Sequence, residues 1–416
     1  MNDATMLTPV QGSERIDALD VLRGFALLGI LLMNIEAMVG PLNGALSGID
    51  PALGGADRWA DALVYYFVQG KFYPLFSLLF GMGFAVMMQR AADAGRPFVR
   101  IYLRRVLALL AIGLAHALLV WSGDILTTYA LVALLLLLFF RDTPQARLPR
   151  WGIAFMLLPI TLMLLSGLMV DVAGLTPGGA REMATLQAQT DTGTAAMLEA
   201  QRQAQGSGSY AQAVAQRGRD LAMMMGYLVF WGGQLLGLFL LGAWFVRSGA
   251  IARPERHAVL YTRLRWLALP VGMVLMAGSI ALSPTMTMGL PGLRDSTVAC
   301  LAMAGGVLMC LGYLAWIVRG LQSASMAGGL RALAPAGRMA LSNYLMQSLV
   351  CTFIFSGYGL GYFEQLPRAW QLPFVLAFYS LQVLASHWWL ARFRFGPMEW
   401  LWRAATYLQL PPMRCG

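Results

Sequence analysis

Charged residues are scarce in this sequence. Only 12% of its 416 residues are Asp, Glu, Lys or Arg, and 58% are hydrophobic, whereas a soluble domain carries about 25% charged and 45–50% apolar residues. The core of a water-soluble protein cannot bury so large a fraction of apolar residues. Apolar runs of about 18 residues or more, the length that spans a membrane as a helix, recur along nearly the whole chain. We therefore expect a membrane protein.

Lysine and cysteine are also rare. Lys71 is the sole lysine, and the other basic residues are arginines, which together with the abundant alanine indicates a GC-rich bacterial genome. Cys300, Cys310, Cys351 and Cys415 form no CxxC pair and lie mostly in apolar stretches. We interpret them as small buried residues, and we expect neither a disulfide framework nor a metal site.

The signatures of common soluble enzymes are missing. The chain has no Walker loop, no GxGxxG after a strand, no HExxH and no GxSxG elbow, which leaves those chemistries without an anchor. The net charge of +10 does not indicate nucleic acid, because a basic surplus in the short loops of a membrane protein sets its orientation.

The apolar runs predict an all-α, polytopic transmembrane bundle of about ten helices in a single domain, 1–416. No internal repeat or second soluble domain stands out. The expected spans are 21–39, 61–88, 103–121, 125–140, 151–173, 221–246, 264–283, 296–317, 339–356 and 373–391.

The loops between these spans differ in basic charge. One side holds the arginine-rich loops, including 90–105 and 247–265, whereas the short loops of the other side hold only Arg58, Arg294 and Arg368. The positive-inside rule then places both termini in the cytoplasm and the chain in a bacterial inner membrane, with the lipid bilayer as its partner.

Two segments lie outside the spans. The long loop 174–220 is predicted to be extracytoplasmic, with a surface helix over 182–205 and a flexible GSGSY stretch after it. The tail 392–416 carries Trp400, Trp402 and Tyr407 among charged residues, which predicts an interfacial amphipathic helix.

The first span contains polar residues that are costly in a membrane. Asp20 and Arg23 stand three apart, so they share a helical face and form either a structural ion pair or part of a ligand site. Asn34 lies in the outer half, where it forms a helix-packing hydrogen bond or belongs to a catalytic site.

The second span holds Lys71 and, three residues later, Pro74, which kinks a helix. Lys71 either snorkels outward or contacts an anion or a carboxylate.

The third span carries His116, and the short turn after it carries Asp124. A histidine and a carboxylate brought together by a tight hairpin can form a base and its orienting acid. Asp124 is also well placed to cap the fourth span, and the two roles are compatible.

A further polar group lies at the inner half of the span 339–356: Arg338, Ser342, Asn343, Tyr344 and Gln347. Helix-to-helix hydrogen bonds explain Ser342 and Gln347. The polar residues thus divide between the two halves of the predicted bundle, which suggests two sites at different depths. The inner half holds Asp20, Arg23, Arg338 and Asn343, and the outer half holds Asn34, Lys71, His116 and Asp124.

Several segments resemble the YeiB-like family of bacterial inner-membrane proteins, grouped as domain of unknown function four-one-eight. They are RIDALDVLRGFALLGILLMNI, GKFYPLFSLLFGMGF, HALLVWSGDILTTYALVALLLLLF, GRMALSNYLMQS and GPMEWLWRAATY, and the resemblance spans nearly the whole chain. That family is in turn distantly similar to transmembrane acyltransferases, which transfer acyl groups supplied from the cytoplasmic side to extracytoplasmic sugars.

The resemblance to the acyltransferases rests on the first helix, where Arg15, Leu19, Asp20, Arg23 and Gly24 match. Asn34 stands where those relatives place their catalytic histidine, and an amide cannot act as a base. The resemblance implies an acyl-CoA donor and a glycan or lipid-linked acceptor. We therefore expect His116, assisted by Asp124, to supply the base. Arg23 and the Arg338 region would hold the phosphates of the donor. Three further residues would contact substrate: Ser342, Asn343 and Lys71.

Two alternatives use the same residues. A transporter or flippase also places ionisable groups at two depths and contains a proline-broken helix. A non-catalytic binding protein on the acyltransferase scaffold would explain Asn34.

Overall fold

The computed structural model describes residues 16–286 and 289–415, and Arg15 lies outside them. Within these ranges the regular structure is entirely helical, apart from two isolated β-bridges. The α-helices are α1 Asp17–Val39, α2 Gly55–Phe67, α3 Phe72–Asp93, α4 Phe98–Leu119, α5 Leu126–Leu135, α6 Leu148–Ala173, α7 Pro177–Arg202, α8 Tyr210–Arg247, α9 Ala258–Arg263, α10 Leu269–Leu282, α11 Leu293–Gly320, α12 Ala324–Arg331, α13 Ala334–Arg338, α14 Ala340–Phe355, α15 Arg368–Leu390 and α16 Pro397–Tyr407. The all-α prediction is confirmed.

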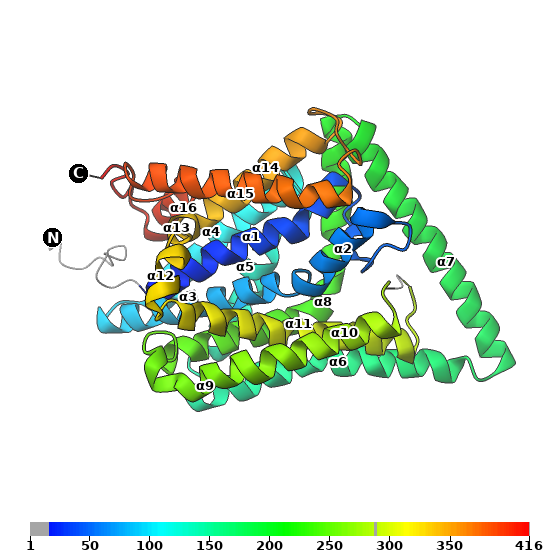
Figure 1. Ribbon diagram of the computed structural model, residues 1–416, viewed down its shortest axis with the longest axis horizontal. Helices are drawn as coiled ribbons and strands as arrows, with labels where there is room; N and C mark the ends of the chain where they lie inside the picture. Colours follow the sequence, from blue (N-terminus) through cyan, green and yellow to red (C-terminus); the bar gives the residue numbers. More distant parts are fainter. Residues whose placement is uncertain (1–15, 287–288, 416) are drawn as a thin grey trace.

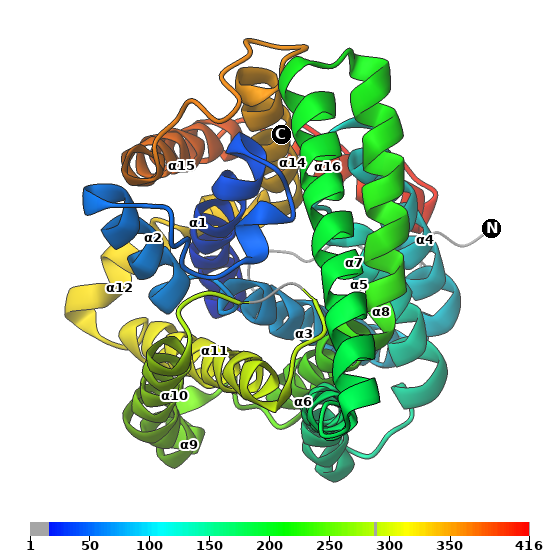
Figure 2. The same ribbon diagram turned by 90° about the vertical axis from the view of Figure 1, so that its right-hand side faces the viewer.

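The long helices run lengthwise through an elongated bundle (Figure 1). We call the end with α12, α13 and α16 the inner end, and the end with α2 and α7 the outer end, after the orientation predicted from the arginines. Seen from the outer end, α1 is surrounded by other helices (Figure 2). It contacts α3, α13, α14 and α15, so α1 lies in the interior of the bundle.

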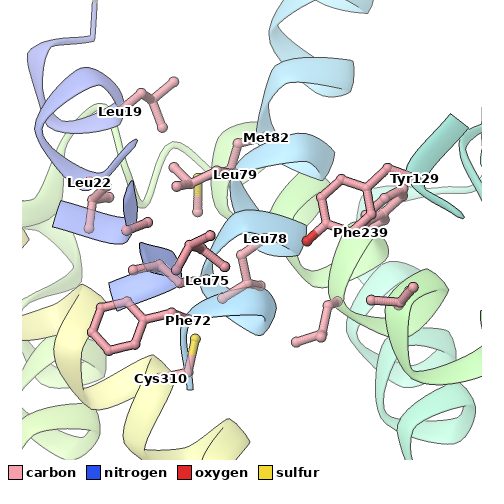
Figure 3. Close-up of a cluster of buried hydrophobic side chains, with 14 of the residues drawn as sticks. Leu19, Leu22, Phe72, Leu75, Leu78, Leu79, Met82, Tyr129, Phe239 and Cys310 are labelled. Atoms are coloured by element: carbon pink, nitrogen blue, oxygen red, sulfur yellow. The ribbon is translucent and has the colours of Figure 1, made fainter. Parts of the chain in front are cut away.

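The core joins α1, α3, α5 and α8 (Figure 3). Leu75 and Leu78 of α3 and Phe239 of α8 are fully buried there. Glycines let α3 and α8 approach closely, since a Cβ on Gly81 would lie 2.0 Å from the Phe239 carbonyl oxygen. Gly237 likewise lets α8 cross α6 closely, since a Cβ there would lie 2.5 Å from the Gly152 carbonyl oxygen.

Six helical segments are long and apolar enough to cross a membrane: Asp17–Val39, Gly55–Asp93, Gln145–Ala173, Pro254–Leu282, Leu293–Gly320 and Arg368–Leu390. The two halves of α8, bent by 68°, make a seventh if they count as one span. The other three expected spans are the helix α4 and two shorter apolar helices, Leu126–Phe140 and Ala340–Phe355. Six to seven spans are thus supported, while the count of ten and the orientation stay predictions.

The apolar helices differ in burial and form a buried group and a peripheral group. The most apolar 18-residue stretches of α1 and α11 are 61% buried, whereas those of the Gln145–Ala173 and Pro254–Leu282 segments are 11% and 17% buried. The peripheral segments expose large apolar side chains such as Leu165, Met169 and Val274. An exposed surface of this kind is suited to lipid.

The segment 174–220 is mostly helical rather than an open loop. The helix expected over 182–205 is the longer α7, which crosses the outer end (Figure 1). The GSGSY stretch is an ordered turn, because Ser209 and Gln212 form a capping box at the start of α8. Arg217 of α8 is fully buried, and its guanidinium donates to the Leu119 carbonyl oxygen at 3.0 Å and to the Tyr358 hydroxyl.

The tail contains the expected helix, α16, which packs on α4 and α14. Three of the four cysteines are buried as expected, and Cys415 is exposed.

Candidate functional site

A buried histidine–carboxylate pair lies where α4 turns into α5. His116 Nδ1 is 2.8 Å from Asp124 Oδ1, and the two side chains are 2% and 0% exposed. The second oxygen of Asp124 accepts the Thr127 amide at 2.7 Å, which caps the start of α5. Asp124 therefore takes both predicted positions at once, as partner of His116 and as cap.

The other ring nitrogen of His116, Nε2, makes no hydrogen bond to the described residues. It is buried, and the Tyr344 ring lies 5.3 Å from the imidazole, centre to centre. If Nδ1–H donates to Asp124, Nε2 carries the lone pair and can accept a proton. The pair is arranged as a base with its orienting acid.

A cavity of about 310 Å³ opens at the inner end. Its deep part is apolar and includes Ile30, Phe80, Tyr129 and Tyr344. Its mouth is polar, with five arginines and two carboxylates: Arg23, Arg90, Arg105, Arg338, Arg403, Asp20 and Glu399. Such a chamber suits an anionic ligand with an apolar portion.

The carboxylates at this mouth are already bonded within the protein. Asp20 pairs with Arg23 at 3.0 Å, so the predicted ion pair is present and also lines the cavity. Glu399 accepts the Leu341 and Ser342 amides at 2.7 and 3.1 Å and the Ser342 hydroxyl at 2.6 Å. Five arginines against two acids leave three positive charges in excess.

A second, much smaller cavity of about 20 Å³ lies toward the outer end. Ser122, Gln201 and Asp220 line it. The Ser122 hydroxyl donates to Asp220 at 2.9 Å, and the Gln201 and Gln216 amides donate to the same carboxylate at 2.9 and 3.0 Å. α7 and α8 therefore close this end with buried polar groups.

About two helical turns separate the residues that line the two cavities on α1 and on α14. On α1, Ile30 lines the inner cavity and Met38 the outer one, and Asn34 lies between them on the same helical face. On α14, Tyr344 lines the inner cavity and Thr352, two turns further, lines the outer one. Asn34 is half-buried, and its side chain makes no hydrogen bond within residues 16–286 and 289–415.

The His116–Asp124 pair lies beside the inner cavity, because the His116 ring is 5.3 Å from the ring of Tyr344, which lines that cavity. In the turn after α4, Ser122 lines the outer cavity and Ile125 the inner one, so Asp124 stands between them in the chain.

Three other predicted site residues lie outside both cavities. Lys71 is fully buried but neither snorkels nor meets a carboxylate in the described structure; its Nζ donates to the Tyr65 and Gln69 carbonyl oxygens, both at 2.7 Å. It thereby provides hydrogen-bond donors for carbonyl oxygens at the C-terminal end of α2. Ser342 joins α14 to Glu399 of α16. Asn343 donates to Ala336 and Ser386 and holds helices together. These contacts indicate structural roles.

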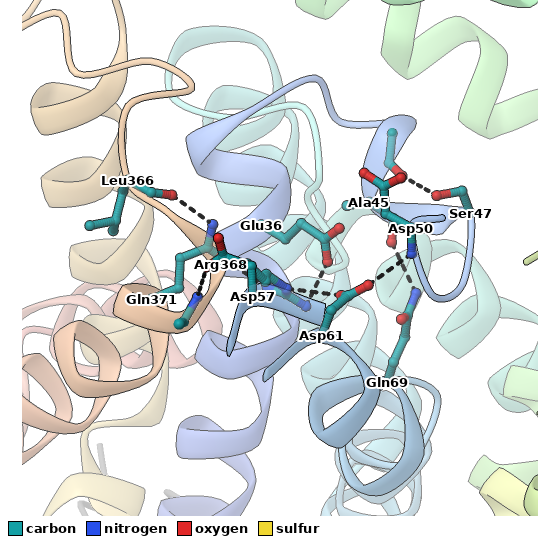
Figure 4. Close-up of polar contacts among 12 residues, drawn as sticks. Glu36, Ala45, Ser47, Asp50, Asp57, Asp61, Gln69, Leu366, Arg368 and Gln371 are labelled. Atoms are coloured by element: carbon teal, nitrogen blue, oxygen red, sulfur yellow. Dashed lines mark hydrogen bonds and ion pairs between the residues drawn. The ribbon is translucent and has the colours of Figure 1, made fainter. Parts of the chain in front are cut away.

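The sequence interpretation missed an ion cluster at the outer end (Figure 4). Arg368 at the start of α15 pairs with Glu36 of α1 at 2.8 Å and Asp61 of α2 at 2.9 Å, and donates to Gln371 at 2.6 Å. The pattern of basic residues assigns Arg368 only to a short outer loop. A signal did exist, because each residue adjoins an apolar run and needs a counter-charge. The pairing itself joins positions 307 residues apart.

No group of three or more His, Cys, Asp or Glu side chains within the described ranges is placed to hold a metal ion.

Comparisons with known proteins find one family model and several relatives of similar length. A family model described as "Protein of unknown function (DUF418)" matches residues 245–409. The chain is 36% identical to the uncharacterized protein YxaH of Bacillus subtilis, over 98% of both chains. It is 32% identical to the uncharacterized protein YeiB of Escherichia coli, over 94% of this chain and 96% of that one.

An uncharacterized 39.9 kDa protein of Bacillus acidopullulyticus is 28% identical over 96% of both chains. No solved structure matches. The apolar helices and the full-length similarity together show that the chain belongs to the YeiB-like DUF418 family of proteins of unknown function.

Proposed function

We propose that the protein is an acyltransferase of a bacterial inner membrane. It takes the acyl group of an acyl-CoA bound in the inner cavity and transfers it to a glycan or lipid-linked acceptor that approaches from the outer, extracytoplasmic end. The observation that carries this proposal is the buried His116–Asp124 pair, whose imidazole lies 5.3 Å from the Tyr344 ring in the wall of the inner cavity.

The pair supplies the proton transfers that acyl transfer needs. His116 Nε2 takes the proton of the acceptor hydroxyl as its oxygen attacks the thioester carbonyl. The tetrahedral intermediate then collapses, the carbon–sulfur bond breaks, and the imidazolium returns the proton to the leaving thiolate. Asp124 holds Nδ1–H and stabilises the imidazolium meanwhile.

Asn34 takes a different part from the histidine of the related acyltransferases. Its amide cannot remove a proton, but its N–H₂ group can donate to the oxyanion of the intermediate. Its position supports this role, since it lies on the face of α1 between the two cavities.

The donor's parts match the two regions of the inner cavity. Phosphates suit the arginine-rich mouth, which Arg23, paired with Asp20, and Arg338 both line. The acyl end suits the apolar depth that ends at Ile125 and Tyr344, next to His116.

Radiolabelled acetyl-CoA offered to the purified protein, with membrane glycolipids as acceptors, tests the proposal. His116→Ala should slow transfer by about 10²–10⁴-fold, while His257→Ala, in the short 3₁₀ turn before α9, should leave it unchanged. Thermal unfolding of both variants checks that they fold. A His116→Ala protein that folds and transfers at the wild-type rate would contradict the proposal.

A transporter or non-catalytic binding protein is the second candidate. The 68° bend in α8 and the break between α2 and α3 favour it, since discontinuous helices are common at transporter binding sites. Mass spectrometry of co-purified ligands separates the two. The second candidate predicts an intact bound ligand and no consumption of acetyl-CoA.

A further inference from the structure

The C-terminal helix α16 forms part of the wall of the inner cavity. It supplies Glu399, Trp402, Arg403 and Tyr407 to the mouth, and it packs along α4. Its first turn is fixed to the start of α14, because Glu399 caps the α14 amides and the Ser342 hydroxyl accepts the Met398 amide at 3.0 Å. A ligand that enters from the inner end therefore passes α16.

An arginine and an aromatic ring are stacked where α16 meets α4. The Arg105 guanidinium lies 3.5 Å from the centre of the Trp402 ring, and the indole N–H donates to the Arg105 carbonyl oxygen at 2.8 Å. A stacked guanidinium keeps its N–H donors in its own plane, where they can bind phosphate oxygens in pairs. Arg403, on the next position of α16, packs over Phe395 at 4.7 Å.

The charge of the mouth selects among anions. The five arginines exceed the two carboxylates by three charges, and both carboxylates are already bonded to protein groups. A lipid monophosphate carries at most about two negative charges. A nucleotide with a pyrophosphate and a further phosphate balances the excess better, and its base offers a flat face to Trp402 and Tyr407.

We propose that α16, together with Arg105, binds the phosphorylated nucleotide end of the donor. This helix then selects a coenzyme A thioester over an acyl group carried on a lipid or on the pantetheine arm of a carrier protein. The identity of the donor rests on the proposed function, whereas nucleotide binding requires no chemistry and is measured separately.

Calorimetry on the full chain in detergent tests this assignment. The probes are coenzyme A, adenosine 3′,5′-bisphosphate as a mimic of its nucleotide end, and pantetheine, which lacks phosphates and base. We expect the bisphosphate to bind and to compete with coenzyme A, more weakly as salt rises, and pantetheine to bind at least tenfold more weakly than coenzyme A.

Three variants sharpen the result. Arg403→Gln should weaken binding of the bisphosphate about tenfold or more. Arg105→Lys keeps the charge but loses the planar stack, so it should weaken binding as well. Arg392→Gln is the matched control, because Arg392 stacks on Trp388 outside the cavity, and it should leave binding unchanged.

The assignment is overturned if the bisphosphate does not bind at millimolar concentration, or if Arg403→Gln binds it as the Arg392 control does. Acetyl-pantetheine serving as donor as well as acetyl-CoA overturns the assignment but leaves acyl transfer standing. Nucleotide binding that depends on Arg403, with no acyl transfer to any acceptor, overturns the proposed function and leaves the assignment standing.

Discussion

Replacing Arg368 by glutamine tests what the outer ion cluster contributes to stability. Arg368 joins three helices, because its guanidinium pairs with Glu36 of α1 and Asp61 of α2 while its backbone begins α15. The arginine and Asp61 side chains are 5% and 1% exposed, and that of Glu36 is 23% exposed. The substitution leaves two carboxylates without their cation.

The cost follows from this burial. Removing one partner of a buried ion pair costs about 3–5 kcal/mol. Asp61 bears most of that penalty, whereas Glu36 is partly solvated and adds less. We expect Arg368→Gln to lower the free energy of unfolding by about 4 kcal/mol. Neutralising the carboxylates as well, with Glu36→Gln and Asp61→Asn in the same chain, should recover most of the loss.

Unfolding in mixed micelles, followed by tryptophan fluorescence, measures both changes. Arg58→Gln is the control, because Arg58 lies exposed on α2, and it should change stability by less than about 0.5 kcal/mol. The reasoning is refuted if Arg368→Gln costs less than about 1 kcal/mol, or if the triple variant is as unstable as the single one.

Two more substitutions probe packing and a buried cation. A Cβ on Gly337 would lie 1.8 Å from the Asp20 carbonyl oxygen, so Gly337→Ala should destabilise the protein by about 1–3 kcal/mol and, by displacing Arg338, weaken coenzyme A binding. Gly328→Ala is the control, because the space around Gly328 is open. Equal stability of the two variants would contradict this packing. Lys71→Met removes two hydrogen bonds from Nζ to carbonyl oxygens and should lower the free energy of unfolding by about 2–4 kcal/mol. The KM of the folded variant for acetyl-CoA should not change. A changed KM at wild-type stability would instead assign Lys71 to the substrate site.

The parts of the site that the sequence predicts are local. His116 and Asp124 are eight residues apart, and a hairpin between two apolar helices leaves them few other partners. Asp20 and Arg23 stand one helical turn apart, so their pairing follows from helix geometry alone. Composition likewise suffices to predict a membrane-embedded helical protein.

Residues that depend on packing between distant helices escape such reasoning. Ser342 and Asn343 look like ligand contacts in the sequence, but which neighbour satisfies them depends on α15 and α16, some 40 to 60 residues away. Glu399 in a charged tail gives no sign that it caps α14. Lys71 needed a partner, as expected, but the partners are backbone carbonyls at a helix break that no side-chain pattern reveals.

The residues that line the two cavities lie close together along α1. Ile30 and Met38 border the two cavities, and eight residues of helix measure about 12 Å, less than half the roughly 30 Å of bilayer hydrocarbon. In the membrane orientation that we propose, water in the inner cavity would carry the potential of that side inward and shorten the distance over which the transmembrane voltage falls. A unit charge that crosses the whole voltage gains or loses about 2.3 kcal/mol per 100 mV. Any proton relayed through His116 from one cavity to the other therefore moves faster or slower with the energisation of the membrane.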